Sequence, residues 1–316
     1  MVGLNDPKGL SEALKDIACV VHMAGPFAVT SAPMLDACLA TQTNYIDITG
    51  EIEVFEAMWS REDEIKRAGI TVVPGAGFDV VPSDCLARYV ASKTEQPASL
   101  VIALRGLESA SQGTLRTAIR QVSKPVLSRR AGAIVILDDR SLFGFGNEPC
   151  VPVSWGDVAT AFHSTGIENI IVYFRRTKLL RSAAILGKLF GPLFRSRIGQ
   201  RGLAAIVRSF PEGPSKAERI GHRGTIWAEA IDRSGRSSKA SLSTRDPYDF
   251  TANSALEISS RISSLPAGLG LVTPSLAFGA DFVLSLPGCF RTDIPSCRTD
   301  LPRQSISTRG LSIGIA

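Results

Sequence analysis

Short apolar runs alternate with helix-like spacing of apolar positions over the first hundred residues. This order predicts an α/β domain, because strands that alternate with helices build a parallel sheet. The near-continuous apolar runs are predicted as strands covered on both faces, at residues 18–24, 44–48, 70–73 and 99–104. Gly, Pro and acidic residues follow the first three of these strands. Since parallel sheets bind ligands beyond their strand carboxyl ends, the three loops predict a binding rim.

Helix signals fill the gaps between the predicted strands. Pro33 suits the first turn of a helix, and Gly69 suits the end of a long one. Ser83 or Asp84 is predicted to cap the helix after the third strand. The predicted helices cover residues 7–17, 34–40, 53–67 and 85–90.

The regular alternation ends after residue 105. Further helices are predicted at 109–128 and 249–265, and further strands at 133–137, 170–174 and 225–231. The pattern predicts an α/β domain over 1–104, an α+β domain over 105–289, and a tail over 290–316. The tail is rich in Ser, Thr and Arg without periodicity, so we predict that it is disordered.

Composition places the chain among globular proteins and narrows its partners. Of its 316 residues, 44% are hydrophobic and 21% charged, which fits two packed domains rather than a disordered chain. The net charge is only +5 and aromatic residues make up 7%, so nucleic acid is not a predicted partner. Residues 1–15 are polar and no uncharged apolar run reaches about 18 residues, so we expect neither a signal peptide nor a membrane span.

The cysteines and histidines show no spacing typical of a metal site or a disulfide framework. No CxxC pair occurs among the six cysteines, and the three histidines lie apart from them. We interpret the cysteines as reduced thiols of a cytosolic protein, predict no metal, and place His22 in the core of its strand. The cysteines are Cys19, Cys38, Cys85, Cys150, Cys289 and Cys297.

The three loops of the rim hold the candidate cofactor contacts. Glycines there let the backbone approach a ligand or adopt positive φ angles, and Phe78 is able to pack on a flat ring. Each feature also has a simpler explanation: the glycines suit ordinary turns, and Glu51 suits the first turn of the next helix. The candidate cofactor-binding residues are Gly25, Pro26, Phe27, Gly50, Glu51, Gly75, Gly77 and Phe78.

Candidate substrate contacts are Asp79, Trp155 and His163. Asp79 follows the third strand, where it can either orient a polar group or cap a helix. His163 can line a substrate pocket or serve a structural role. No proton donor stands out: Tyr45, His163 and Arg105 are the possibilities, and the catalytic residue is left unassigned.

Residues 178–210 combine apolar positions with seven basic side chains and contain no acidic residue. A cationic amphipathic segment of this kind suits a membrane interface or a long lipid tail. The alternative is a dimerisation or core helix with a solvated basic face. The segment therefore leaves peripheral membrane contact, a lipid-like substrate and a homodimer open.

Five motifs occur in order along the chain, at residues 24–27, 45–51, 74–84, 155–161 and 273–279. Together they resemble the saccharopine dehydrogenase-like family of NAD(P)-dependent oxidoreductases. Within it the chain is most similar to the branch of mycobacterial trans-acting enoyl reductases and animal saccharopine dehydrogenase-like oxidoreductases. The resemblance spans residues 1–289. It implies a Rossmann-type fold, a substrate and dimerisation role for the α+β domain over 105–289, and NADP or NAD as cofactor. It also implies reduction of a carbon–carbon or carbon–nitrogen double bond.

The family's glycine-rich phosphate loop has no counterpart before the first predicted strand. The resemblance therefore implies an incomplete Rossmann-type sheet whose edge, residues 18–24, is uncovered. Charge-assisted hydrogen bonds contribute roughly 1.5–3 kcal/mol each, so losing two or three would weaken cofactor binding by ~100-fold or far more. We expect impaired cofactor binding and a truncated gene product or gene model.

Taken together, the sequence predicts an NAD(P)-dependent oxidoreductase that acts on a small-molecule or lipid-like substrate. Two alternatives remain open at this point. One is a non-catalytic protein that keeps the fold and binds membranes or lipids. The other is an inactive fragment.

Overall fold

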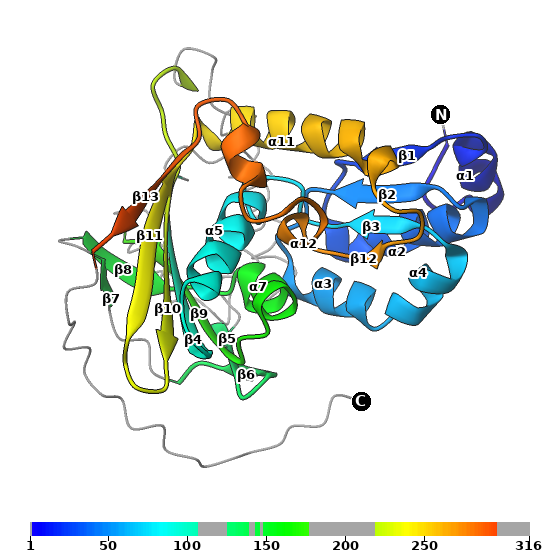
Figure 1. Cartoon of the computed structure of the whole chain (residues 1–316). Coiled ribbons are helices and arrows are strands. Elements are labelled where there is room, and N and C mark those ends of the chain that lie inside the picture. The colour runs from blue at the N-terminus through cyan, green and yellow to red at the C-terminus, as the bar shows by residue number, and fades with distance from the viewer. Residues whose placement is uncertain (1, 107–124, 139–142, 146–147, 177–218, 296–316) are drawn as a thin grey trace, which may run out of the picture.

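The computed structural model describes residues 2–106, 125–138, 143–145, 148–176 and 219–295 (Figure 1). Within these residues the chain forms two β-sheets that helices cover. The larger hydrophobic cluster includes Ile46 and Val73 of the first sheet together with Leu100 and Ile226 of the second. The two sheets therefore share one core, in which full burial of an Ile or Leu side chain contributes roughly 1.5–3 kcal/mol.

The first sheet holds four strands in the order β1-β2-β3-β12, and each neighbouring pair is parallel. Their bounds are β1 (Cys19–His22), β2 (Asn44–Asp47), β3 (Thr71–Val73) and β12 (Gly270–Leu271). The register sets Tyr45 beside Val20 on one side and Val72 on the other. Parallel neighbours joined by helical crossovers are the arrangement of doubly wound α/β sheets. The predicted parallel α/β architecture is confirmed.

Helices lie on both faces of this sheet. The helices of the first region are α1 (Pro7–Leu14), α2 (Phe27–Thr41), α3 (Ile52–Trp59) and α4 (Glu62–Ala68). The crossovers β1–α2–β2 and β2–α3–α4–β3 lie on one face, and α11 (Pro247–Arg261) runs along the opposite face (Figure 1). The second region of the chain thus completes the cover of the first sheet.

Two predicted helices differ from the observed ones. Pro33 lies inside α2 rather than at its start, because the helix begins at Phe27. There the carboxylate of Glu51 accepts hydrogen bonds from the first amides of the helix. The long helix predicted at 53–67 is two helices separated at Ser60 and Arg61. Gly69 ends the second of them in the left-handed conformation, as predicted.

The second sheet has nine strands among the described residues, with β13-β11-β10-β4-β9-β5-β6 as its main path and β7 and β8 attached through β9. Their bounds are β4 (Pro97–Arg105), β5 (Leu127–Arg130), β6 (Ala133–Ile136), β7 (Phe143–Phe145), β8 (Glu148–Pro152), β9 (Asn169–Arg175), β10 (Thr225–Asp232), β11 (Ser237–Ser243) and β13 (Phe290–Ile294). Helices α5 (Val81–Ser92) and α7 (Asp157–Thr165) cover one of its faces (Figure 1).

Short helical elements lie before and after β12, in the part of the chain that leaves the second sheet after β11 and returns to it at β13. They are α12 (Pro274–Phe278) and the 3-10 turns η1 (Ile262–Ser264) and η2 (Phe282–Ser285). The helix predicted at 249–265 corresponds to α11 followed by η1. The predicted strand at 99–104 exists as β4, but it pairs with β10 and β9 in the second sheet instead of extending the first.

Three further predictions differ from the structure. Ser83 and Asp84 lie inside α5, which begins at Val81, and so do not cap it. The end of the helix predicted at 109–128 is strand β5 instead, and residues 107–124 lie outside the described residues. Within the predicted tail, β13 pairs with β11, and Asp293 accepts hydrogen bonds from Tyr89 and Lys93 of α5. Residues 296–316 lie outside the described residues.

Among the residues that the structure describes, no helix is long and apolar enough to cross a bilayer. The five described cysteines are free thiols, and burial raises the pKa of Cys19 to about 11 and of Cys38 to about 12. No group of acidic, histidine or cysteine side chains in the described ranges has the arrangement of a metal site. The basic segment 178–210 and Cys297 lie outside these ranges.

Candidate functional site

Three loops meet at the carboxyl ends of β1, β2 and β3, and we call them the rim: residues 23–27, 48–51 and 74–80. Asp47, the last residue of β2, holds two of the loops together. Its Oδ1 accepts hydrogen bonds from the amides of Thr49 at 3.0 Å and Gly75 at 2.9 Å. Its Oδ2 accepts one from the Tyr45 hydroxyl at 2.7 Å. Asp47 is therefore the residue that fixes the second loop against the third.

Burial opposes the charge of this carboxylate, and the hydrogen bonds favour it. Asp47 has an exposed fraction of 0%. Desolvation raises its pKa to about 6, although the amides of Gly75 and Thr49 and the Tyr45 hydroxyl act in the opposite direction. Burial beside Asp47 also raises the pKa of Tyr45 above its ordinary value. Tyr45 thus serves as a buried hydrogen-bond donor to Asp47 and is a poor proton donor to substrate.

Glu51 closes the amino end of α2. Its two carboxylate oxygens accept hydrogen bonds from the amides of Phe27 at 3.0 Å and Ala28 at 3.1 Å. A carboxylate at a helix amino terminus is stabilising, because the free amides and the helix dipole both favour negative charge. The sequence predicted this role for the helix that follows Glu51, but the structure places it on the helix that precedes it.

Helix α11 fixes the third loop from the opposite side of the sheet. The Phe78 amide donates to Oγ1 of Thr251 at 3.0 Å, and the Ser254 hydroxyl donates to the carbonyl of Ala76 at 2.6 Å. The Phe78 ring is 2% exposed and packs edge-to-face on Phe250, with ring centroids 5.9 Å apart. Its side chain is therefore a core element and is not available to a cofactor ring, which corrects the predicted contact.

The second region of the chain meets the rim at Asp79. The Trp155 indole Nε1 donates to the main-chain carbonyl of Asp79 at 2.9 Å. The carboxylate of Asp79 lies against Gly50, where an added Cβ would be 2.9 Å from Oδ2. A Cβ at Gly156 would be 3.3 Å from the Gly50 carbonyl. The structure therefore brings together Gly50, Asp79 and Trp155, three of the residues that the sequence singled out.

The rim residues differ in how far they reach solvent. Gly25 and Pro26 are exposed, whereas Gly50, Glu51 and Asp79 are partly exposed and Gly75 and Gly77 are buried. Gly75 has a φ of +74°, and a Cβ there would lie 2.7 Å from the Val80 side chain, so this position requires glycine. The group that lies close to the Gly75 backbone is thus the Val80 side chain and not a ligand. The open part of the rim consists of its first two loops and Asp79.

His163 lies away from this rim. Its ring stacks on Trp59 at the far end of α3, with centroids 3.8 Å apart and planes 7° apart. Burial, together with the nearby Arg129 guanidinium, lowers the pKa of His163 to about 4. The third candidate donor, Arg105, ends strand β4 of the second sheet. His163 therefore belongs to the packing between α3 and α7, which is the structural alternative weighed for it above.

Two further carboxyl groups, absent from the predicted site, lie beneath the third loop. Asp84 of α5 and Asp157 of α7 each have an exposed fraction of 0%. Oδ2 of Asp84 accepts from the Ser275 amide at 2.7 Å, at the start of α12. Burial raises the pKa of Asp157 well above its ordinary value, and the nearby carboxyl groups of Asp84 and Asp79 reinforce this. Single Asp residues in helices carry no sequence signal for such an arrangement.

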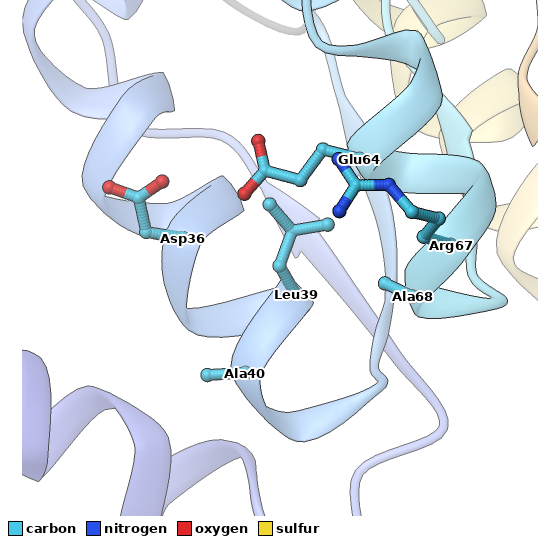
Figure 2. A pocket seen from close by; sticks show the side chains of 6 residues that line it. All are labelled: Asp36, Leu39, Ala40, Glu64, Arg67 and Ala68. Atoms are coloured by element: carbon cyan, nitrogen blue, oxygen red, sulfur yellow. The ribbon is translucent and has the colours of Figure 1, made fainter.

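A surface hollow lies between α2 and α4, away from the rim (Figure 2). Its lining residues are Asp36, Leu39, Ala40, Glu64, Arg67 and Ala68. Arg61 crosses beside it, 2.7 Å from both Asp36 and Glu64. The carboxylates of the hollow are thus already paired within the chain.

The rim fits one end of a nicotinamide dinucleotide better than the other. It contains no Lys, Arg or His, and Glu51 already occupies the amides at the start of α2. A diphosphate needs such amides or cations, whereas the nicotinamide and its ribose, which carry no negative charge, do not. Exposed Gly25 and Pro26 and partly exposed Gly50 leave backbone open to a flat ring. The three loops therefore suit the nicotinamide riboside, and the diphosphate requires residues other than these.

Comparisons with known proteins show which family the first region of the chain resembles. Residues 2–73 match the family model of the saccharopine dehydrogenase NADP binding domain. A saccharopine dehydrogenase-like oxidoreductase of Bos taurus is 27% identical over 111 residues, which cover 35% of this chain and 26% of that protein. Its Mus musculus counterpart is 29% identical over 82 residues, which cover 26% of this chain and 19% of that protein. The aligned part thus spans about a quarter or less of the length of these relatives.

A solved structure shows the same fold over nearly the whole chain. The apo saccharopine dehydrogenase (L-Glu forming) of Saccharomyces cerevisiae matches with a TM-score of 0.58 and 12% sequence identity. The match covers 93% of this chain and 88% of that one. At this identity the match concerns the fold, including the second sheet, which lies beyond the residues of the family model.

Proposed function

Because the chain belongs to the saccharopine dehydrogenase-like family of NAD(P)-binding oxidoreductases, we propose that it reduces a double bond in a lipid-like substrate with NADPH or NADH. The observation that carries the proposal is the junction at Asp79. There the loops at the carboxyl ends of parallel strands meet Trp155 and Gly156 of the second region. Open α/β sheets bind dinucleotides at this edge, next to the domain that supplies the substrate contacts.

The role of the chain's own residues is to position the cofactor and the substrate, not to carry out the redox step. A bound nicotinamide supplies the hydride, so the protein has to orient the ring and the substrate and exclude water. Gly25, Pro26 and Gly50 offer backbone to the ring. Asp47 and Glu51 hold the loops rigid through five hydrogen bonds of 2.7 to 3.1 Å. Trp155 is the candidate substrate contact from the second region.

Cofactor affinity is proposed to be weak. The rim contributes no cation to the diphosphate, and Glu51 places a carboxylate where a phosphate would otherwise bind. Each missing charge-assisted hydrogen bond costs roughly 1.5–3 kcal/mol, so two of them weaken binding by ~100-fold or more. We expect dissociation constants for NADPH and NADH in the range of about 0.1 to 1 mM.

The lipid-like character of the substrate rests on the sequence of residues 178–210, which lie outside the described residues. Their basic and apolar side chains suit an acyl chain or a lipid surface. The same segment supports a proposed peripheral membrane contact, and the homodimer also stays a prediction.

Calorimetric titration of the full chain tests the cofactor part of this proposal. NADPH, NADH and reduced nicotinamide mononucleotide should bind with similar affinities, because the rim holds the part that they share. Gly25→Val, which adds side chain at an exposed rim position, should abolish binding, and Gly3→Val, at an open position outside the rim, should not. Absence of binding by the wild type at millimolar cofactor would overturn the proposal. Low-micromolar binding of NADPH alone would contradict the proposed weak affinity.

A further inference from the structure

Of the carboxyl groups in the three rim loops and at the end of β2, only that of Asp79 makes no hydrogen bond to the residues that the structure describes. Asp47 accepts three hydrogen bonds, Glu51 accepts two, and Asp84 accepts one from Ser275. The Asp79 side chain makes none to any residue that the structure describes, although its main-chain carbonyl receives the Trp155 indole. Asp79 is thus the rim carboxyl without a structural task for its side chain.

The position of this side chain suits chemistry at the nicotinamide. Asp79 is partly exposed, whereas Asp84 and Asp157 behind it have exposed fractions of 0%. Its Oδ2 lies next to Gly50, whose backbone belongs to the open part of the rim. Its own backbone is fixed to the second region through Trp155. A proton on this carboxyl therefore sits between the proposed ring site and the proposed substrate side.

We propose that Asp79 is the catalytic residue that exchanges a proton with the substrate. The proposal rests on the proposed function and assigns its missing acid. In reduction, the electrophilic carbon of the substrate double bond gains the hydride that the reduced nicotinamide supplies. The electron pair of the double bond moves to the neighbouring atom, which takes the proton from Asp79. The resulting Asp79 carboxylate regains a proton from solvent at its exposed side, and oxidation follows the same path in reverse.

The surroundings of Asp79 shift its pKa toward the pH range in which a carboxyl group can both donate and accept a proton. Desolvation raises its pKa to about 7, and general acids work best when their pKa is near the operating pH. The charged groups near this region are acidic: Asp84 from α5, Asp157 from α7, Asp47 from the end of β2 and Glu51 from the second loop. No cation is bonded to the Asp79 side chain among the described residues, so nothing in that part of the chain holds it ionised.

The first test needs no substrate. Dissociation constants of NADP⁺ and NADPH are measured for the full chain about one unit below and one unit above pH 7. An ionised Asp79 favours the cationic ring of NADP⁺ over neutral NADPH, so the affinity ratio should change roughly three- to tenfold between the two pH values. Asp79→Asn should make the ratio independent of pH. Asp63→Asn, an equal charge change at an exposed position of α4, should behave like the wild type.

The second test measures turnover, with a long-chain trans-2-enoyl thioester as the probe and loss of NADPH as the signal. Asp79→Asn should lower kcat about 100-fold or more and leave NADPH affinity within about threefold. Equal turnover by wild type and Asp79→Asn, or an affinity ratio in the wild type that ignores pH, would overturn the assignment. Failure of the wild type to bind NADPH would instead overturn the proposed function. If the wild type binds NADPH but does not turn over the probe, the substrate class is wrong and the affinity ratio decides the role of Asp79.

Discussion

Two regions of this fold bury a carboxyl group completely, and they do so in opposite ways. Asp47 at the end of β2 accepts three hydrogen bonds, from two loop amides and one hydroxyl. Neither carboxylate oxygen of Asp157 at the start of α7 has a hydrogen-bond partner in the described part of the chain. A buried carboxylate that is hydrogen-bonded organises its surroundings, and one that is not costs stability whenever it ionises. The hydrogen bonds of Asp47 therefore stabilise the rim, whereas the buried carboxyl group of Asp157 lowers the stability of the fold when it is ionised.

The largest expected effect comes from removing the hydrogen-bonded carboxylate. Asp47→Ala leaves the Tyr45 hydroxyl and the amides of Thr49 and Gly75 buried without a partner. Each unsatisfied group costs roughly 1–3 kcal/mol, so we expect the free energy of unfolding to fall by about 3 kcal/mol or more. Urea denaturation measures the change. A loss below about 1 kcal/mol would contradict the organising role of Asp47.

Replacing Asp157 is expected to raise the free energy of unfolding, in contrast to replacing Asp47. Because burial raises its pKa in the folded protein well above 3.8, the folded state binds a proton more tightly than the unfolded state does. Stability is therefore lost as the pH rises from about 4 through the folded pKa. Asp157→Asn should raise the free energy of unfolding by about 1–3 kcal/mol at pH 8 and change it little near pH 4. A destabilised Asp157→Asn at pH 8, seen in paired urea titrations, would mean that the ionised form is bonded after all.

The smallest effect is expected at Glu51, which lies at the surface of the same rim. Glu51→Gln removes the charge at the amino end of α2 and keeps one acceptor for its amides. Such charges contribute roughly 0.3–1 kcal/mol and are screened by salt. We expect a loss of about 1 kcal/mol at low salt that shrinks at high salt. Glu12→Gln on α1 is the control and should be neutral; equal effects of the two substitutions would remove the capping role.

The apolar runs predicted β1, β2 and β3 of the first sheet and the rim at their carboxyl ends. The pattern was informative because strands covered by helices on both faces are predominantly apolar. The same pattern assigned β4 to the first domain, although β4 belongs to the second sheet, and it did not predict β12. Strand β4 is apolar enough for either sheet, and β12 has two residues, too few for a pattern. Assignment to a sheet depends on contacts between residues far apart in the chain.

The candidate site was predictable in part, for the same reason. Gly50, Asp79 and Trp155 stand in motifs that suggested a site, and the structure brings them together. The roles of Glu51 and Phe78 were not predictable, because both depend on distant partners: the start of α2 for Glu51 and helix α11 for Phe78. Pro33 misled the helix prediction because its amide-free backbone suits a first turn, and the true start is fixed by Glu51.

The most direct test of the account is an NMR titration of the three tryptophan indoles with NADPH. Trp155 donates its indole proton to Asp79 at the rim, whereas Trp59 stacks on His163 and Trp227 lies on strand β10 of the second sheet. If the cofactor binds at the rim, the Trp155 indole signal shifts on addition of NADPH and the Trp59 and Trp227 signals stay in place. A shift of Trp59 or Trp227 with Trp155 unchanged would place the cofactor elsewhere and rule out the rim as its site.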